Sequence, residues 1–230
     1  MQFEFMTNPG ITATFIAGFV MLIAGVIVYA RDKDKKSNFF FLLLASSAAA
    51  WSITLGLFEI TRSVYAANYL LTLVYITAAI TPLTLLFFSL ALATEKISLS
   101  RTKFIFTLLP FILVSIGLII PDFMLKNMDG YDGRAKVIAF GPWFPLFIAY
   151  ILGYLFLSLG ILVKRYHESA GIFKVELRYI LLSTLAAILC SLVANLFLPN
   201  VGVFKFFWLG PVIIVFTLLI AGFLIIKYNF

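Results

Sequence analysis

The chain has 230 residues, of which 63% are hydrophobic and 12% are charged. An average soluble domain has roughly 45–50% apolar and about 25% charged residues, so this composition excludes a water-soluble fold. The formal net charge is +7 and the isoelectric point is about 9.5, yet the basic residues lie in short stretches beside apolar runs. That pattern is typical of membrane topology and argues against nucleic acid as a partner.

Seven apolar stretches fill most of the sequence, and each is long enough to cross a lipid bilayer. A spanning helix needs roughly 20 mostly apolar residues. The stretches cover approximately residues 11–30, 38–59, 65–93, 103–120, 144–163, 174–197 and 206–226. The sequence therefore predicts one domain, residues 1–230, that is an all-α integral membrane protein with a bundle of seven transmembrane helices.

The basic residues predict how this bundle is oriented. Of the 17 Lys and Arg residues, twelve lie in the first, third and fifth connections and at the C-terminus, and five lie on the other side. The positive-inside rule then places the N-terminus outside and the C-terminus in the cytoplasm. The basic connections also predict contact with anionic lipid headgroups; charges that only set the topology are the alternative.

The connection at residues 121–143, between the fourth and fifth helices, is predicted to be extracytoplasmic. It has turn signals at residues 127–130 and 131–133 and a β-prone stretch at residues 135–140. A short hairpin that caps the bundle and an irregular loop both agree with this pattern. Aromatic residues at the outer helix ends, such as Tyr65, Tyr69, Trp143 and Trp208, are typical of an interfacial belt, with a ligand cage as the alternative.

Polar residues that could have a function within the membrane are few. Glu59 ends the second stretch and Arg62 follows one turn later, so the two side chains can pair at the membrane surface. The alternative is that Glu59 faces an outward-opening cavity and binds a polar or cationic group. The amide of Asn195, near the outer end of the sixth stretch, needs partners inside the bundle or in water.

Small residues form a pattern in two of the stretches. Residues 45–50 are an unbroken run of Ala and Ser, and Ser183, Ala187, Ser191 and Ala194 follow helical spacing in the sixth stretch. Such faces allow helix backbones to approach closely in a membrane. We therefore expect the second and sixth helices to be buried within the bundle.

Three prolines fall within the predicted helices: Pro82 in the third, Pro110 in the fourth and Pro211 early in the seventh. Each removes a backbone hydrogen bond and can kink its helix or act as a hinge. Thr81 and Thr84 flank Pro82, so their hydroxyls can satisfy freed carbonyl groups or line a cavity.

The sequence offers no chemistry for catalysis or metal binding. One cysteine, Cys190, and one histidine, His167 in a polar inner loop at residues 164–169, cannot build a Cys/His zinc site. No cluster of His, Asp and Glu is predicted at membrane depth, so we expect no catalytic residues and no cofactor. The middle of the seventh stretch lacks the lysine that would bind retinal as a Schiff base.

Four phrases along the sequence carry a family resemblance. They are Trp51 with residues 57–59 (Leu-Phe-Glu), residues 141–144 (Gly-Pro-Trp-Phe) with Tyr150, residues 174–178 (Lys-Val-Glu-Leu-Arg), and residues 209–211 (Leu-Gly-Pro) with 226–230 (Ile-Lys-Tyr-Asn-Phe). Together they resemble the N-terminal seven-helix sensor region of bacterial histidine kinases and related diguanylate cyclases.

The resemblance implies a receptor module in the bacterial plasma membrane that transmits a cue to a cytoplasmic signalling effector and works as a homodimer. The sequence ends at Phe230 without an ATP-binding region, a cyclase motif or a phosphoacceptor context for His167. We therefore expect the effector, a histidine kinase or diguanylate cyclase, either downstream of Phe230 or in a separate protein.

Two functions remain open at this point. The first is a sensor that binds a small amphipathic or apolar ligand in an outward-facing pocket, which needs only a few polar groups to orient the ligand. The candidate ligand-binding residues are Trp51, Glu59, Tyr75, Trp143, Tyr150, Asn195 and Trp208. The alternative is a small seven-helix transporter, although the first three and last three spans do not form a convincing repeat.

Overall fold

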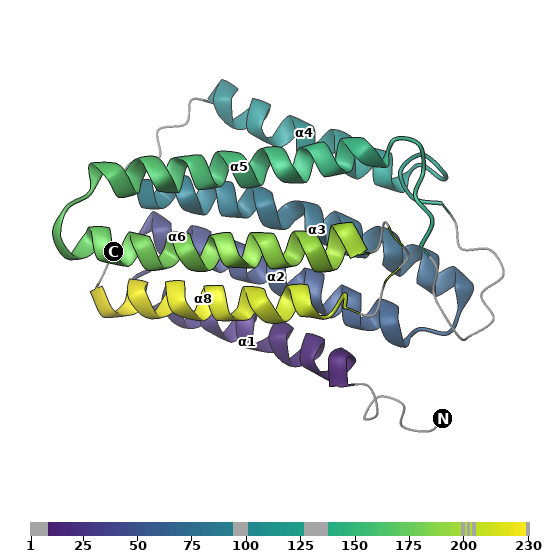
Figure 1. The fold of residues 1–230 in the computed structure, drawn as a ribbon, viewed down its shortest axis with the longest axis horizontal. Coiled ribbons are helices and arrows are strands. Elements are labelled where there is room, and N and C mark those ends of the chain that lie inside the picture. Colours follow the sequence, from purple (N-terminus) through teal and green to yellow (C-terminus); the bar gives the residue numbers. More distant parts are fainter. Residues whose placement is uncertain are drawn as a thin grey trace.

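The computed structural model describes residues 9–93, 101–126, 138–198, 201, 203 and 206–228. Within these residues, seven helices are long and apolar enough to cross a membrane, which confirms the predicted seven-helix bundle (Figure 1). The helices are α1 (Pro9–Arg31), α2 (Lys36–Ile60), α3 (Val64–Ala93), α4 (Arg101–Ile119), α5 (Phe144–Glu168), α6 (Gly171–Leu192) and α8 (Leu209–Tyr228). A π-helical segment, η2 (Val193–Phe197), continues α6.

The helix bounds agree with the sequence to within a few residues, except between α5 and α6. The polar stretch at residues 164–169 was predicted to be a loop, but α5 continues through it to Glu168. Lys164 and Glu168 form an ion pair across one helical turn, with 3.8 Å between Nζ and Oε1. His167 is therefore an exposed residue in the last turn of α5, and α5 and α6 are joined by only Ser169 and Ala170.

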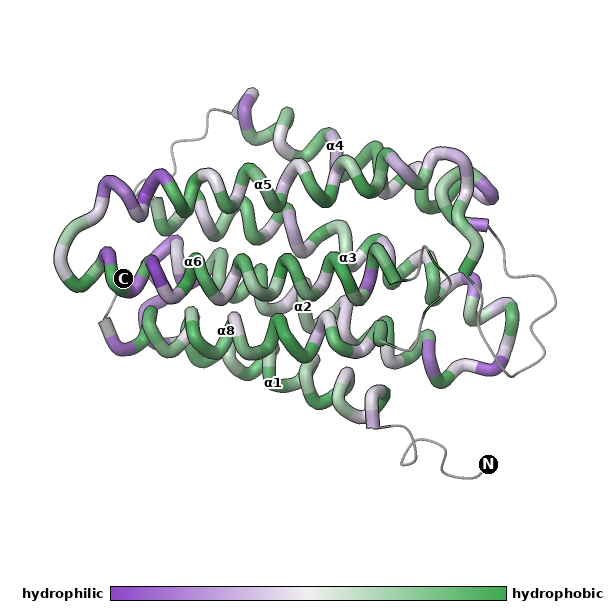
Figure 2. The backbone as a smooth tube through the Cα atoms, viewed as in Figure 1, coloured by the Kyte–Doolittle hydropathy of each residue, from purple (hydrophilic) through white to green (hydrophobic). Residues whose placement is uncertain are grey.

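Six helices form a closed ring. In the order α1, α2, α3, α5, α6, α8, each packs against the next, and α8 closes the ring against α1 and α2. Helix α4 lies outside the ring against α3 and α5 (Figure 1). We call the end of the bundle with the α4–α5 connection the cap end, and the opposite end, where α8 finishes, the C-terminal end. Figure 2 shows hydrophilic residues mainly near these two ends, as the membrane interior requires.

The α1–α2–α3 side is tightly packed, and α2 is buried as predicted, with 56% of its spanning window inside the bundle. A Cβ atom added to Gly25 of α1 would lie 2.8 Å from the Cβ of Ala45 on α2. Hydroxyl groups join the helices as well: Ser52 Oγ donates to the Thr14 carbonyl oxygen at 2.6 Å. The run of small residues on α2 therefore allows close packing against a neighbouring helix, as its composition predicts.

The corresponding prediction for α6 is wrong, because only 28% of its spanning window is buried. Its helical neighbours in the ring are α5 and α8, and much of its surface is not covered by another helix. Ala187 and Ala194 are buried and Ser183 and Ser191 are half-buried, so the small-residue face does point into the bundle. Two residues of this face, Ala187 and Ser191, border a cavity rather than a closely packed helix.

The α4–α5 connection folds back over the cap end. Leu125 and Phe140 form an antiparallel bridge, and the Lys126 amide donates to the Ala139 carbonyl oxygen at 2.9 Å. A hairpin would require such a pairing at its base, while residues 127–137, which contain the predicted turns, lie outside the described part of the chain. A Cβ at Gly141 would collide with the carbonyl oxygen of Phe123, so the crossing of the two segments requires glycine there.

The three prolines differ in their surroundings. Pro82 lies inside α3 and Pro110 lies inside α4, where a proline removes a helix hydrogen bond. Pro211 is the third residue of α8. Backbone N–H groups in a first turn have no acceptor within the helix, so Pro211 removes no hydrogen bond there and, contrary to expectation, gives α8 no reason to kink.

Candidate functional site

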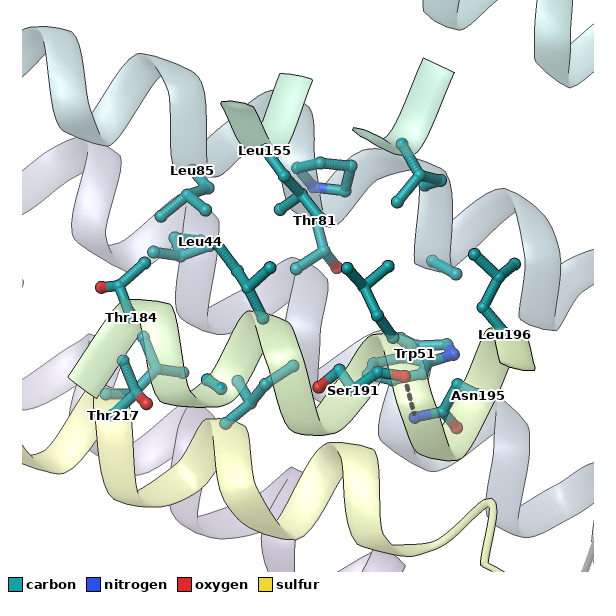
Figure 3. Close-up of a pocket in the computed structure, with 18 of the residues that line it drawn as sticks. Leu44, Trp51, Thr81, Leu85, Leu155, Thr184, Ser191, Asn195, Leu196 and Thr217 are labelled. Atoms are coloured by element: carbon teal, nitrogen blue, oxygen red, sulfur yellow. Dashed lines mark hydrogen bonds between the residues drawn. The ribbon is translucent and has the colours of Figure 1, made fainter. Parts of the chain in front are cut away.

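A cavity lies at the centre of the helix ring. Its volume is about 170 Å³, and its lining comes from α2, α3, α5, α6 with η2, and α8, together with Phe207. On the α6 side the lining runs from Thr184 to Leu196, which is about 18 Å of helix at 1.5 Å per residue. The cavity is therefore long and narrow and follows the direction of the helices (Figure 3).

The wall of this cavity is almost entirely apolar. Among the described residues, its lining includes no Asp, Glu, Lys, Arg or His. Apolar cavities of roughly 150 Å³ in proteins stay free of water and bind small apolar molecules. The polar side-chain groups in the lining are an indole N–H, an amide and a few hydroxyls, contributed by Trp51, Tyr75, Thr81, Thr184, Ser191, Asn195 and Thr217.

Three of the predicted ligand-binding residues meet toward the cap end of this cavity. Trp51 of α2 and Tyr75 of α3 are buried, at 7% and 6% exposure, and Asn195 of η2 is half-buried. The Tyr75 ring packs edge-on against Phe147, with 5.3 Å between ring centroids, and against Phe144 in the same manner. Figure 3 shows Trp51 and Asn195 together at one end, with Thr184 and Thr217 at the other.

Two hydroxyl groups in the lining are not satisfied. Within the described part of the chain, Tyr75 Oη and Ser191 Oγ are buried and have no hydrogen-bond partner. The other lining hydroxyls include Thr217, which donates to the Ser183 carbonyl oxygen at 3.0 Å, and Thr81, which donates to Thr77 at 3.3 Å. An unsatisfied buried polar group costs about 1–3 kcal/mol, so a partner for either hydroxyl would stabilise the protein.

The π-helical segment η2 explains how Asn195 is held. Its side-chain Nδ2 donates to the Ser191 carbonyl oxygen at 3.2 Å, the acceptor that the Asn195 backbone amide would use in a regular α-helix. One turn later, the Leu198 amide donates to the Val193 carbonyl oxygen, five residues back. Single π turns of this kind often occur at functional sites. The pattern of the sequence did not indicate this one.

Glu59, Trp143 and Trp208 lie outside the lining. Glu59 is half-buried near the end of α2. Trp143 is 51% exposed and stacks on Phe123, with ring centroids 5.5 Å apart. Trp208 packs against the start of α1, where a Cβ on Gly10 would lie 2.7 Å from its ring. Trp143 is therefore placed at the surface as a belt residue would be, and Trp208 is part of the helix packing.

Tyr150 is also outside the cavity lining, although it is only 6% exposed. Its hydroxyl donates to the Ala79 carbonyl oxygen of α3 at 2.8 Å. Ala79 lies in the turn that precedes Pro82, where the missing proline N–H leaves the Ala78 carbonyl without its helix donor. Tyr150 therefore ties α5 to the interrupted turn of α3. Thr81 and Thr84, expected to satisfy freed carbonyl groups or to line a cavity, donate to the carbonyl oxygens of Thr77 and Thr81 on their own helix, and Thr81 lines the cavity.

The fold, the cavity and the matching phrases of sequence point to one family. The family model described as the N-terminal 7TM region of histidine kinase matches residues 13–230. The chain belongs to this family. The search of curated proteins gave no match. Membership makes the chain a multi-pass transmembrane sensory module, and the cavity lies within its membrane-spanning part.

One further buried group in this sensor region was missed in the sequence. Glu176 of α6 is 3% exposed, and its Oε1 has no hydrogen-bond partner among the described residues. The ammonium group of Lys227, in the last turn of α8, interacts electrostatically with it. Acidic residues in spanning helices are costly and often functional. Glu176 was overlooked because Lys174 and Arg178 gave its segment the character of a basic helix start.

No metal or cofactor site accompanies the cavity in the part of the sensor region that the structure describes. In those residues no three His, Cys, Asp or Glu side chains are grouped so that they could hold a metal ion. The only chemistry that the cavity wall offers is apolar contact and hydrogen bonding.

Proposed function

We propose that this sensor region holds a small apolar or amphipathic molecule in the central cavity and transmits its presence to a histidine kinase in the cytoplasm. The observation that carries the proposal is the cavity itself, a long apolar space of about 170 Å³ in the middle of the helix ring. Trp51, Tyr75 and Asn195 are the predicted residues that would contact the ligand. The other four predicted residues, Glu59, Trp143, Tyr150 and Trp208, lie outside the cavity lining and would not contact the ligand.

The distribution of basic residues supports an orientation for this receptor. Arg31, Lys33, Lys164 and Lys227 all lie at the C-terminal end of the bundle, and positive charge favours the cytoplasmic side. The cap end would then face outward, so that Trp51, Tyr75 and Asn195 occupy the outer half of the cavity. The C-terminal end would face the kinase.

Helices α6 and α8 provide a route from the cavity to that end. Both line the cavity, through Ala187 on α6 and Thr217 and Ala221 on α8. Beyond the cavity, Glu176 of α6 interacts with Lys227 of α8. A ligand that favours one arrangement of α6 against α8 would change this contact, and a receptor can transmit only what its ligand binds differently in two states.

Filling the cavity with a side chain tests the coupling without knowledge of the ligand. The chain would be joined after Phe230 to the catalytic region of a histidine kinase, and autophosphorylation would be measured in proteoliposomes. Ala187→Leu places a large side chain in the cavity, whereas the neighbouring Ala186 is exposed on the outer side of α6. We expect Ala187→Leu to change the rate by about fivefold or more, the scale of typical allosteric coupling, and Ala186→Leu to leave it unchanged.

The same rate in both variants and in the unmodified chimera would show that occupancy of the cavity is not coupled to the kinase. A change of equal size in both variants would point to a general disturbance of α6. Either result would contradict the proposal.

A further inference from the structure

The polar atoms of the cavity define what kind of ligand it accepts. Tyr75 Oη and Ser191 Oγ both belong to residues of the lining and both lack a hydrogen-bond partner in the described residues. Hydroxyls in spanning helices commonly donate to a carbonyl of their own helix. Ser183, two turns before Ser191, does so at 3.1 Å to Ile180. Ser191 has the same opportunity and is left without a partner beside an empty space.

Among the described residues, the fully buried hydroxyls that lack a partner and belong to the cavity lining are those of Tyr75 and Ser191. Ser89 and Ser115 also have buried hydroxyls without a partner among the described residues, but neither lines the cavity. Tyr75 and Ser191 approach the cavity from different helices, α3 and α6. A ligand oxygen that reached both could accept a hydrogen bond from one and donate to the other.

The charge of the lining and the shape of the cavity narrow the class of ligand further. A carboxylate or ammonium group in this cavity would have no charged side chain to pair with among its described lining residues, and a buried unpaired charge is strongly disfavoured. The lining along α6 extends about 18 Å at 1.5 Å per residue, while the volume is only about 170 Å³. Such a space fits a thin, flexible chain better than a fused ring system.

We infer that the ligand is a neutral, elongated molecule with an apolar chain and a single hydroxyl or carbonyl group, of the kind represented by a medium-chain alcohol. Its oxygen hydrogen-bonds to Tyr75 and Ser191, and its chain extends toward Thr184 and Ala221. This inference rests on the proposed function, since it names the class of molecule for the same cavity.

Titration of the purified chain in nanodiscs of neutral lipid tests the inference, with 1-octanol, n-octane and octanoate as probes. Trp51 lines the cavity, so Trp143→Phe and Trp208→Phe would leave its fluorescence as the only tryptophan signal. We expect 1-octanol to give a saturable change and octanoate to bind at least tenfold more weakly. Ala187→Leu should abolish the saturable response, and Ala186→Leu should retain it.

Two conservative variants then examine the polar contacts. Tyr75→Phe and Ser191→Ala should each weaken 1-octanol binding about fivefold, as expected for one hydrogen bond, and leave n-octane binding unchanged. Both should also raise the Tm of the ligand-free protein, because each removes an unsatisfied buried hydroxyl. A merely structural role for these hydroxyls would lower the Tm instead.

The outcomes distinguish this inference from the proposal on which it rests. Saturable binding of n-octane that equals that of 1-octanol, with no effect of Tyr75→Phe or Ser191→Ala, would overturn the inference and leave the cavity as an apolar binding site. Tighter binding of octanoate than of 1-octanol would overturn the inference that the ligand is neutral. The absence of a saturable response to all three probes would overturn both the inference and the binding of small molecules in the cavity.

Discussion

Helices α2 and α6 carry similar small residues and use them in opposite ways. On α2, Ala45 packs so close to α1 that a Cβ on Gly25 would lie 2.8 Å away. On α6, Ala187 and Ser191 border a cavity. Small residues therefore remove volume from a helix surface in both cases, and the opposing surface decides whether a neighbouring backbone fills that volume or leaves it empty. In this protein one side of the ring is closed by such residues and the other is hollow.

The hydroxyl groups of serine and threonine follow this division in part. On the closed side, Ser52 donates to the Thr14 carbonyl oxygen at 2.6 Å, and the hydroxyls of Ser47 and Thr84 are 2.8 Å apart. On the hollow side, Thr217 of α8 donates to the Ser183 carbonyl oxygen of α6 at 3.0 Å, but the hydroxyl of Ser191 has no partner among the described residues. Interhelical hydrogen bonds therefore occur on both sides, and the α6 side also retains a hydroxyl that could bond to a ligand.

The largest difference is expected when the same large side chain is placed on each helix. Ala48 of α2 is 0% exposed and belongs to the packed core, so Ala48→Leu should lower the free energy of unfolding by about 3 kcal/mol through overpacking. Ala187→Leu should change it by less than about 1 kcal/mol, because its side chain enters the cavity. Unfolding in mixed micelles with increasing SDS would measure both. Equal losses would mean that the two sides are equally full.

A smaller contrast is expected between two glycines. Gly25→Ala adds a Cβ that meets Ala45 at 2.8 Å, whereas a Cβ on Gly153 of α5 meets no atom within 4 Å. We expect Gly25→Ala to cost about 1 kcal/mol after the gain in helix propensity, and Gly153→Ala to cost nothing. Thermal unfolding in the same detergent would compare them. A destabilised Gly153→Ala would show that α5 is packed more closely than the structure indicates.

The smallest effect concerns two serines. Ser52→Ala removes a hydrogen bond between α1 and α2, and such bonds in membrane proteins average about 0.6 kcal/mol. Ser191→Ala removes a hydroxyl without a partner in the described chain, so it should make the protein slightly more stable. A double-mutant cycle is unnecessary, because the difference in sign between the two single variants decides the question. A loss of stability in Ser191→Ala would reveal a partner for its hydroxyl.

The sequence was sufficient to predict the helices, because hydrophobic length has little ambiguity in a membrane protein. It also placed Trp51, Tyr75 and Asn195, three residues of the cavity lining, among the candidate ligand-binding residues, and their contact with a ligand stays a prediction. It could not identify which aromatic residues share a cavity. Tyr150 and Tyr75 look alike in the sequence, yet the Tyr150 hydroxyl bonds to the backbone of α3 and the Tyr75 hydroxyl does not bond to any described residue.

The remaining errors have physical causes as well. Glu59 was chosen because a carboxylate adjoining an apolar run is unusual, while Glu176 was hidden between Lys174 and Arg178. Burial depends on which side of the helix faces the bundle, and a uniformly apolar helix does not reveal that side in its sequence. The cavity itself could not be predicted, because its volume depends on how several helices pack together. The sequence of any one helix does not indicate it.

The unsatisfied hydroxyls of Tyr75 and Ser191 have a consequence for protein engineering. A procedure that optimises only the stability of the empty bundle would replace them with Phe and Ala, and would judge both changes to be improvements. The resulting protein would be more robust in detergent and easier to crystallise. It would also have lost the two groups on which the proposed recognition of a ligand depends, so a stabilised version of this sensor should be engineered elsewhere, on the closed side of the ring.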